Sequence, residues 1–123
     1  MEKSIKKKLS KKKYNWLVTG SSGFIGTNIV KKLLELKQNV IGIDIKNSKI
    51  NNNSLHFIKG NILNNKTLKK IPKNVDFVLH QASLTSVQDS IKKPKLYYNQ
   101  NVNAFVKLLK TLRSLLYSVS LLS

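Results

Sequence analysis

The chain has no cysteine, only five acidic residues against 23 basic ones, and no long apolar run. Without cysteine it can have neither a disulfide framework nor a thiolate zinc site, and such a composition suits a reducing compartment. No apolar stretch approaches the roughly 20 residues that a membrane-spanning helix needs. The basic amino-terminal segment lacks the apolar centre of a secretory signal. We therefore expect a cytoplasmic protein with no membrane partner and no metal site.

The net charge of +18 raises the question of a nucleic-acid partner. Clustered cations bind phosphate by releasing counterions, but here only Arg113 is arginine, the residue best suited to bidentate phosphate and base recognition. The lysines are spread along the chain, apart from seven within residues 1–13. Nucleic acid is therefore not expected as the main partner. A stand-alone basic module that binds NAD or nucleic acid is kept as an alternative.

Short apolar runs alternate with helical patterns along the chain. The expected strands are 15–20, 39–45, 54–62 and 75–83, and the expected helices are 24–38, 64–71, a turn at 86–93, and 95–114. Residues 115–123 fit either a fifth strand at 115–119 or an irregular tail. This alternation predicts an α/β fold with βαβ units: an incomplete Rossmann-type doubly wound parallel sheet of the first four or five strands. The expected division is a basic arm at 1–13 and a truncated NAD-binding domain at 14–123.

Three of the chain's five glycines lie in the segment TGSSGFIG, between the first strand and the first helix. Gly20 is expected to make the tight turn out of the strand, and Gly23 to let the backbone approach a pyrophosphate. Gly26 is expected to let the helix pack closely on the sheet, with Ile25, Ile29, Leu33 and Leu36 on its apolar face. The helix amino terminus then offers free N–H groups to an anion. This pattern predicts a dinucleotide site.

Asp44 ends the second strand, 24 positions after Gly20. This is near the separation at which a carboxylate binds the adenosine ribose. A carboxylate there would repel a 2′-phosphate, so NAD is expected rather than NADP. Lys46 and Lys49 are close enough along the chain to soften that preference.

These motifs resemble the extended short-chain dehydrogenase/reductase family, also called the NAD-dependent epimerase/dehydratase family. TGSSGFIG has the family's glycine spacing, and VIGIDI, KGNI and DFVLHQAS are similar to its successive blocks. HQASLTSVQDSIKKP is most similar to the UDP-N-acetylglucosamine 4-epimerase branch, with the UDP-glucose and UDP-glucuronate 4-epimerases as near alternatives. The resemblance runs from about Trp16 to Leu112 and implies the amino-terminal part of such an enzyme, with a nucleotide-sugar substrate and, as often in the family, a homodimer.

The resemblance also implies roles for matching positions. Backbone amides of Phe24 and Ile25 would bind the pyrophosphate, Asp44 the ribose, and Asn61, where the family usually has aspartate, the adenine amino group. His80 is interpreted as a core histidine without an acid–base role, and Asn61 and Ser86 have simpler interpretations as loop and helix caps. The complete set of implied cofactor positions is Gly20, Gly23, Phe24, Ile25, Gly26, Asp44, Asn61, Ile62, Gln81, Ala82, Ser83, Gln100 and Asn101. Ser86 and Val87 match positions near the sugar.

The catalytic motif of the resembled family is missing. Its members move a hydroxyl proton with the tyrosine of Y-x-x-x-K, while NAD carries the hydride. The residues four positions after Tyr14, Tyr97, Tyr98 and Tyr117 are Val18, Asn101, Val102 and Leu121, so none is lysine. No catalytic residue is therefore assigned, and this chain alone is expected to be inactive. A nucleotide-sugar 4,6-dehydratase or reductase of the same family is the alternative enzyme.

Overall fold

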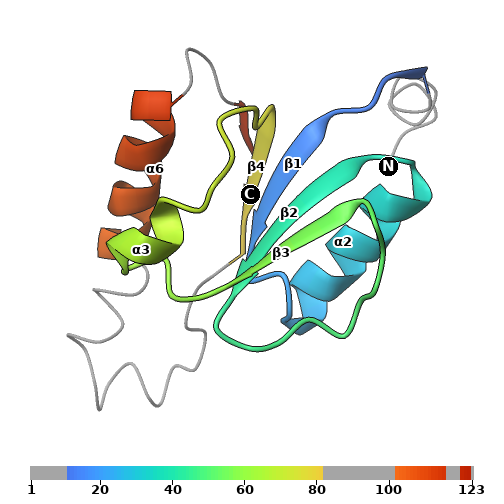
Figure 1. Ribbon diagram of the computed structural model, residues 1–123, viewed down its shortest axis with the longest axis horizontal. Helices are drawn as coiled ribbons and strands as arrows, with labels where there is room; N and C mark the ends of the chain where they lie inside the picture. Colours follow the sequence, from blue (N-terminus) through green and yellow to red (C-terminus); the bar gives the residue numbers. More distant parts are fainter. Residues whose placement is uncertain (1–10, 82–101, 116–119, 123) are drawn as a thin grey trace.

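A parallel sheet forms the centre of the computed structural model, which describes residues 11–81, 102–115 and 120–122. All four strand pairings are parallel, and the spatial order is β3-β2-β1-β4-β5 (Figure 1). The strands are β1 Asn15–Thr19, β2 Asn39–Asp44, β3 Leu55–Lys59, β4 Phe77–His80 and β5 Ser120–Leu122. The α/β prediction and its parallel sheet are confirmed.

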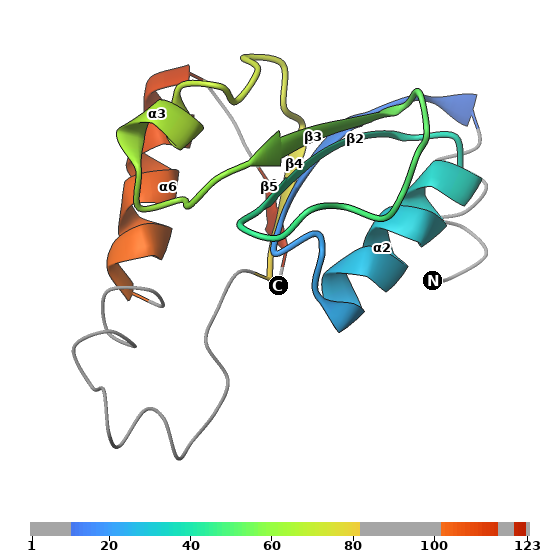
Figure 2. The same cartoon turned by 60° about the horizontal axis from the view of Figure 1, so that its bottom comes forward.

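Helices cover both faces of this sheet. The helices are α2 Phe24–Glu35, α3 Asn65–Leu68 and α6 Ala104–Leu115. In Figures 1 and 2, α2 lies on one face, whereas α3 and α6 lie together on the other. Because the chain crosses from β1 through α2 to β2, and later returns past β1 to β4, the order of the strands reverses between β1 and β4. In sheets of this kind, ligands bind at the carboxyl ends of the strands near such a reversal.

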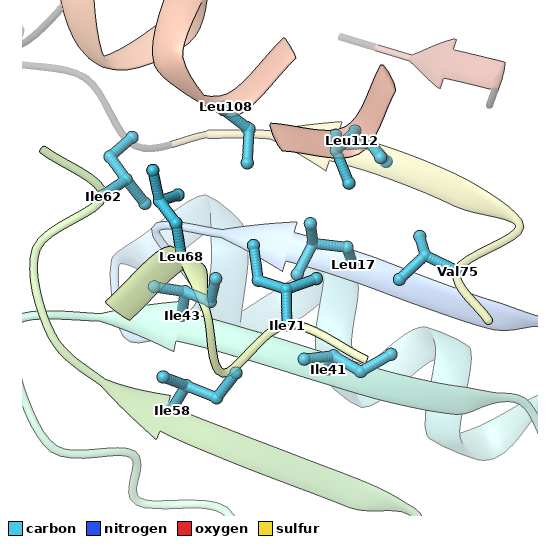
Figure 3. Packing of buried hydrophobic residues seen from close by; sticks show 11 residues of the cluster. Leu17, Ile41, Ile43, Ile58, Ile62, Leu68, Ile71, Val75, Leu108 and Leu112 are labelled. Carbon is cyan, nitrogen blue, oxygen red and sulfur yellow. The ribbon is translucent and has the colours of Figure 1, made fainter. Parts of the chain in front are cut away.

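The central strand β1 divides its side chains between two hydrophobic cores. Leu17 belongs to the cluster under α3 and α6 (Figure 3), and Val18 belongs to the cluster under α2. Both are fully buried, as the alternation of side chains along a strand requires when both faces are covered. Burial of one such side chain stabilises the fold by about 1.5–3 kcal/mol. On α6, Leu108 and Leu112 complete the first cluster.

The apolar face of α2 differs from the prediction at its first turn. The buried residues are Gly26, Val30 and Leu33, whereas Ile25 is 61% exposed. Successive residues of a helix are rotated by about 100°. Since Gly26 packs against the loop after β1, its neighbour Ile25 is turned toward solvent. Ile25 was therefore wrongly placed on the buried face.

The carboxyl-terminal strand also lies at a different place than expected. Helix α6 continues to Leu115, and the strand that pairs with β4 is Ser120–Leu122, not 115–119. Leucine and serine alternate too freely in this stretch to fix a strand boundary from pattern alone. Leu115 belongs to α6, so no strand begins there, and 116–119 lie outside the described residues. The fifth strand that the sequence left open as an alternative is present at Ser120–Leu122.

Helix α2 ends in a Schellman motif that has lysine where glycine is usual. Lys37 has a φ of 60°; its N–H donates to the carbonyl of Leu34, and the N–H of Gln38 donates to that of Leu33, both at 3.0 Å. These two bonds satisfy carbonyls that the helix end would otherwise leave unpaired. The left-handed conformation costs a residue with a Cβ more than it costs glycine.

Gln38 is fully buried and holds the start of β1 in place. Its Oε1 accepts from the N–H of Tyr14 at 2.9 Å and from Nε1 of Trp16 at 3.0 Å. Its Nε2 donates to the carbonyls of Lys12 and Leu36 at 3.0 and 3.2 Å. Both ends of a buried amide are thus hydrogen-bonded, which offsets the cost of its burial. The chain before β1 is fastened to the end of α2 by this side chain.

Substitution of Lys37 by glycine is expected to stabilise the protein. Lys37→Gly relieves the left-handed strain and should raise the free energy of unfolding by about 0.5–1 kcal/mol. The matched control is Lys31→Gly, on the exposed side of α2, which should lower it by about 1 kcal/mol. Urea denaturation followed by fluorescence of Trp16, the single tryptophan, measures both. A loss of stability in Lys37→Gly would contradict the prediction.

Candidate functional site

The loop between β1 and α2 turns at Gly20 and is bound to the neighbouring strand. Gly20 has a φ of 69°, in the region that favours glycine because a Cβ would be strained there. Its N–H donates to the carbonyl of Ile43 on β2 at 2.8 Å. The tight turn predicted at Gly20 is therefore present, and it lies beside the carboxyl end of β2.

The other two glycines of the loop stand in different surroundings. A Cβ on Gly26 would collide with the carbonyl oxygen of Gly20, so the packing of α2 on the loop requires glycine there. A Cβ on Gly23 would lie 3.4 Å from the same oxygen, an ordinary contact, and its φ of −74° suits any residue. The fold therefore needs Gly26 but does not need Gly23.

The amino terminus of α2 offers unpaired backbone donors. Its N-cap is Gly23, with no side-chain cap, and its first turn carries no acidic residue. Phe24 and Ile25 begin the helix with side chains that are 86% and 61% exposed. The first N–H groups of a helix have no partner within it, and they carry the positive end of the helix dipole. This arrangement suits an anion.

Asp44, at the end of β2, faces the same loop. Its Oδ2 accepts from the N–H of Ser22 at 3.0 Å, and its Oδ1 accepts from the N–H of Lys46 at 2.9 Å. The hydroxyl of Ser22 donates to the carbonyl of Lys46 at 3.0 Å. The carboxylate is thus oriented by two backbone donors and retains lone pairs for a further donor. It lies on the side of the sheet edge where the glycine loop emerges, as the dinucleotide interpretation requires.

Ser21 is buried beneath the loop, and its hydroxyl has no hydrogen-bond partner among the described residues. It is 4% exposed and faces Gly42 on β2, where an added Cβ would lie 2.7 Å from the Ser21 Oγ. Glycine at position 42 is therefore what lets the loop lie close to the strand. An unpaired buried hydroxyl costs free energy.

The carboxyl end of β4 is joined to the carboxyl end of β1 by side-chain bonds. Thr19 is fully buried, and its Oγ1 lies 2.7 Å from Nδ1 of His80. The N–H of Gln81 donates to the Thr19 carbonyl and to Oγ1, both at 3.1 Å. The ring of Phe105, from α6, packs on the imidazole with centroids 5.1 Å apart. Burial lowers the pKa of His80 below its ordinary value of 6.5.

The expected adenine contact, Asn61, follows β3 and is hydrogen-bonded within the protein. Oδ1 of Asn61 accepts from the N–H of Leu63 at 2.9 Å, which is the loop cap that the sequence offered as its simpler interpretation. The side chain of Ile62 is buried in the core under α3 and α6. A shallow hollow of about 600 Å³ lies beside Asn61; it is lined by Asn61, Leu63, Asn64, Asn65, Lys66 and Lys69.

The structure therefore brings some expected site residues together and leaves others undescribed. The glycine loop, Asp44 and Gln81 lie at the carboxyl ends of β1, β2 and β4. The remaining expected positions lie outside the described residues: Ala82, Ser83, Gln100, Asn101, Ser86 and Val87.

Sequence reasoning did not single out Thr19, Ser22 or Gln38. Thr19 had a visible signal, because a hydroxyl directly before the first glycine is placed at a strand end. Gln38 had none, since a glutamine after a helix is ordinary on the surface.

Among the described residues, no group of three histidine, cysteine or acidic side chains could hold a metal ion. The described helices include none that is long and apolar enough to cross a membrane.

The family model described as the NAD-dependent epimerase/dehydratase family matches residues 16–122. The chain belongs to this family. The glycine loop and the acid at the end of β2 are the parts of the match that the geometry places together, and the resemblance seen in the sequence is confirmed.

Similar proteins and solved structures support the same family assignment. The UDP-glucose 4-epimerase of Yersinia enterocolitica is 37% identical over 106 residues, which are 76% of this chain and 32% of that enzyme. The Bordetella bronchiseptica enzyme WbmF, solved with NAD⁺, superposes with a TM-score of 0.77 at 28% identity, covering 88% of this chain and 35% of that one. The chain spans about a third of the length of the curated relative.

A third similar protein is the UDP-N-acetylglucosamine 4-epimerase of Methanobrevibacter ruminantium, solved in complex with UDP-N-acetylmuramic acid. It is 33% identical, with a TM-score of 0.74, and the match covers 85% of this chain and 35% of that chain. The family's members that resemble this chain thus include 4-epimerases of more than one UDP-sugar.

Removal of the Ser21 hydroxyl is expected to stabilise the protein. Ser21→Ala deletes an unpaired buried group and should raise the free energy of unfolding by about 1 kcal/mol. The matched control is Ser22→Ala, which deletes the hydroxyl bonded to Lys46 and should lower stability by about 0.5 kcal/mol. Thermal and urea denaturation measure both. A destabilised Ser21→Ala would show that the hydroxyl has a partner.

Proposed function

We propose that this chain is the NAD-binding portion of a nucleotide-sugar 4-epimerase. The observation that carries the proposal is the convergence of the uncapped α2 amino terminus and the oriented Asp44 carboxylate on one loop. Diphosphate and ribose are adjacent groups in a dinucleotide, and these two features are the donor and the acceptor that they need.

The residues present fit such a cofactor. At Gly23 the fold leaves room for a Cβ that the sequence does not supply, which is expected where a pyrophosphate must approach the backbone. The amides of Phe24 and Ile25 would bind its oxygens, and Asp44 would accept from ribose hydroxyl groups. Gln81 would contact the cofactor near its nicotinamide ribose. NAD is proposed rather than NADP because a 2′-phosphate would meet the carboxylate of Asp44.

Bound NAD would supply the hydride chemistry at C4 of the sugar. This chain's own residues would bind and orient the cofactor: the helix dipole neutralises diphosphate charge, and the two backbone bonds to Asp44 fix its carboxylate. The described residues with these roles all lie at the carboxyl ends of the strands. The proton transfer of epimerisation falls to residues that this chain does not contain, since it has no Y-x-x-x-K sequence.

The proposed substrate of the complete enzyme is a UDP-sugar. The HQASLTSVQDSIKKP segment favours UDP-N-acetylglucosamine, and the similarity to a UDP-N-acetylglucosamine 4-epimerase supports it. UDP-glucose is the second candidate, because the curated relative from Yersinia enterocolitica has that name. Action in the cytoplasm is proposed with it, as the cysteine-free composition indicates.

Helix α6 carries an exposed apolar stripe that suits a partner. Val102, Val106 and Leu109 are 43%, 41% and 39% exposed, and their spacing places them on one side of the helical segment. The neighbouring face, with Leu108 and Leu112, is buried. The homodimer implied by the family resemblance would use this stripe, and it stays a prediction.

Binding of NAD is the direct test. The chain is expected to bind NAD in isothermal titration calorimetry, and Gly23→Ala should raise its Kd by about tenfold or more because the added methyl occupies the approach to the loop. The same substitution should leave the free energy of unfolding within about 0.5 kcal/mol of the original. The matched control, Gly26→Ala, should destabilise the protein itself, since its Cβ collides with Gly20.

Two outcomes would contradict the proposal. One is no heat of binding with NAD for the unsubstituted chain at millimolar concentration. The other is unchanged affinity in Gly23→Ala.

Epimerisation by this chain alone is expected to be absent. Incubated with NAD and UDP-N-acetylglucosamine, the purified chain should leave the sugar unchanged, because no tyrosine is paired with a lysine four residues later. Chromatographic separation of the two C4 epimers measures this. Any measurable interconversion above a heat-denatured control would show that another residue moves the proton.

A further inference from the structure

Three features that suit parts of a dinucleotide follow one another across the carboxyl ends of neighbouring strands. The glycine loop leaves β1, Asp44 ends β2, and Asn61 comes shortly after the end of β3; these strands lie side by side in the sheet (Figure 1). The N–H of Gly60 donates to the carbonyl of Asp44 at 2.9 Å. Asn61 therefore directly follows a residue that is bonded to the end of β2, on the side away from the glycine loop.

The order of these features matches the order of groups in the adenosine half of NAD. Diphosphate, ribose and purine are joined in that sequence. A cofactor with its diphosphate at the amino terminus of α2 and its ribose at Asp44 therefore carries its purine on toward the end of β3. Asn61 is exposed there, beside the hollow of about 600 Å³. Its side chain is in place to bind the base.

We propose that Asn61 makes the base subsite tolerant of the group at position 6 of the purine, so that a cofactor with hypoxanthine in place of adenine binds about as well as NAD. The inference rests on the proposed function and concerns the choice of cofactor. Adenine has an amino group at this position, which donates hydrogen bonds. Hypoxanthine has a carbonyl oxygen there, which accepts them.

The amide of Asn61 retains both kinds of hydrogen-bonding group. The N–H of Leu63 donates to its Oδ1 at 2.9 Å. This bond uses one of the two lone pairs of Oδ1 and neither of the protons of Nδ2. The remaining lone pair suits the amino group of adenine, and an Nδ2 proton suits the carbonyl oxygen of hypoxanthine. The same side chain thus serves either base without breaking its bond to Leu63.

The other residues around the hollow provide no carboxylate that would select the amino group. They include Lys66 and Lys69 but no acidic residue. Oδ1 of Asn64, which also lines the hollow, accepts from the N–H of Lys66 at 2.9 Å. Ammonium groups only donate, so they favour a carbonyl oxygen at least as much as an amino group.

A carboxylate at position 61 would discriminate between the bases. Both of its oxygens accept, so it would bind the amino group of adenine but repel the carbonyl oxygen of hypoxanthine. A site that offers only acceptors rejects an analogue that has lost the matching donor. Asn61→Asp makes this change at almost constant size, and a carboxylate oxygen can still accept from the N–H of Leu63.

The matched control is Asn64→Asp. It adds the same charge to the same hollow, and the new carboxylate can still accept from the N–H of Lys66. Any general effect of the charge on an anionic cofactor is therefore shared by the two variants. Only Asn61→Asp is expected to change the preference between the two bases.

The experiment is calorimetric titration of each protein with NAD and with nicotinamide hypoxanthine dinucleotide, at one pH and one salt concentration. In the unsubstituted chain and in Asn64→Asp, the two Kd values should agree within about threefold. In Asn61→Asp the Kd of the hypoxanthine cofactor should rise to about tenfold above that of NAD. Urea denaturation followed by the fluorescence of Trp16 checks that both variants are folded.

The unsubstituted chain tests the inference without any variant. A Kd for the hypoxanthine cofactor more than about threefold above that for NAD would overturn the inference while the proposed function stands. So would a ratio of the two Kd values that is the same in Asn61→Asp and Asn64→Asp. Absence of NAD binding by the unsubstituted chain would overturn the proposed function and this inference with it.

Discussion

The backbone pairing of β1 with a strand on each side is the constraint from which the rest of the site follows. Because β1 is hydrogen-bonded to both β2 and β4, the chain leaves its carboxyl end between two other strand ends. The loop that leaves there is bound by the N–H of Gly20 to Ile43 and through Ser22 to Asp44. A helix amino terminus that suits an anion and an oriented carboxylate are thereby brought to the same edge of the sheet.

The three glycines of the loop differ in whether the fold itself requires them. Gly20 and Gly26 are required by the geometry of the protein itself, one by its backbone angle and the other by the closeness of the loop. Gly23 has no such requirement, and the proposed close approach of a pyrophosphate would account for it. On the interior side of the loop, Ser21 carries a buried hydroxyl that has no hydrogen-bond partner among the described residues.

Much of this architecture could be predicted from the sequence because its signals are local. Apolar runs fix where β1, β2 and β4 lie, the glycine spacing fixes the first turn, and the position of Asp44 after a strand places it at the correct edge. The errors arise where the decision is made by distant parts of the chain. Ile25 has the spacing of a buried residue, but the packing of Gly26 turns it outward. The last strand was left open between a strand at 115–119 and an irregular tail, because leucine and serine give no boundary.

Side-chain networks were the least predictable part. Thr19 and His80 are 61 residues apart in sequence, and only the register of β1 with β4 makes them partners. In the sequence Gln38 has the context of an ordinary surface residue, but the fold buries it among backbone groups. Such residues carry no periodic signal, since their role depends on which unpaired donors and acceptors the tertiary structure leaves within reach.

The amide of Gln38 also determines where the amino-terminal segment enters the molecule. By binding the carbonyl of Lys12, it brings the chain in at the end of the sheet where β1 starts, and the glycine loop leaves from the other end. A surface linkage made at the exposed side chain of Lys12 therefore joins the protein on the side remote from the glycine loop. Immobilisation at this residue would leave the glycine loop and Asp44 open to solution, which is the orientation that a biosensor needs.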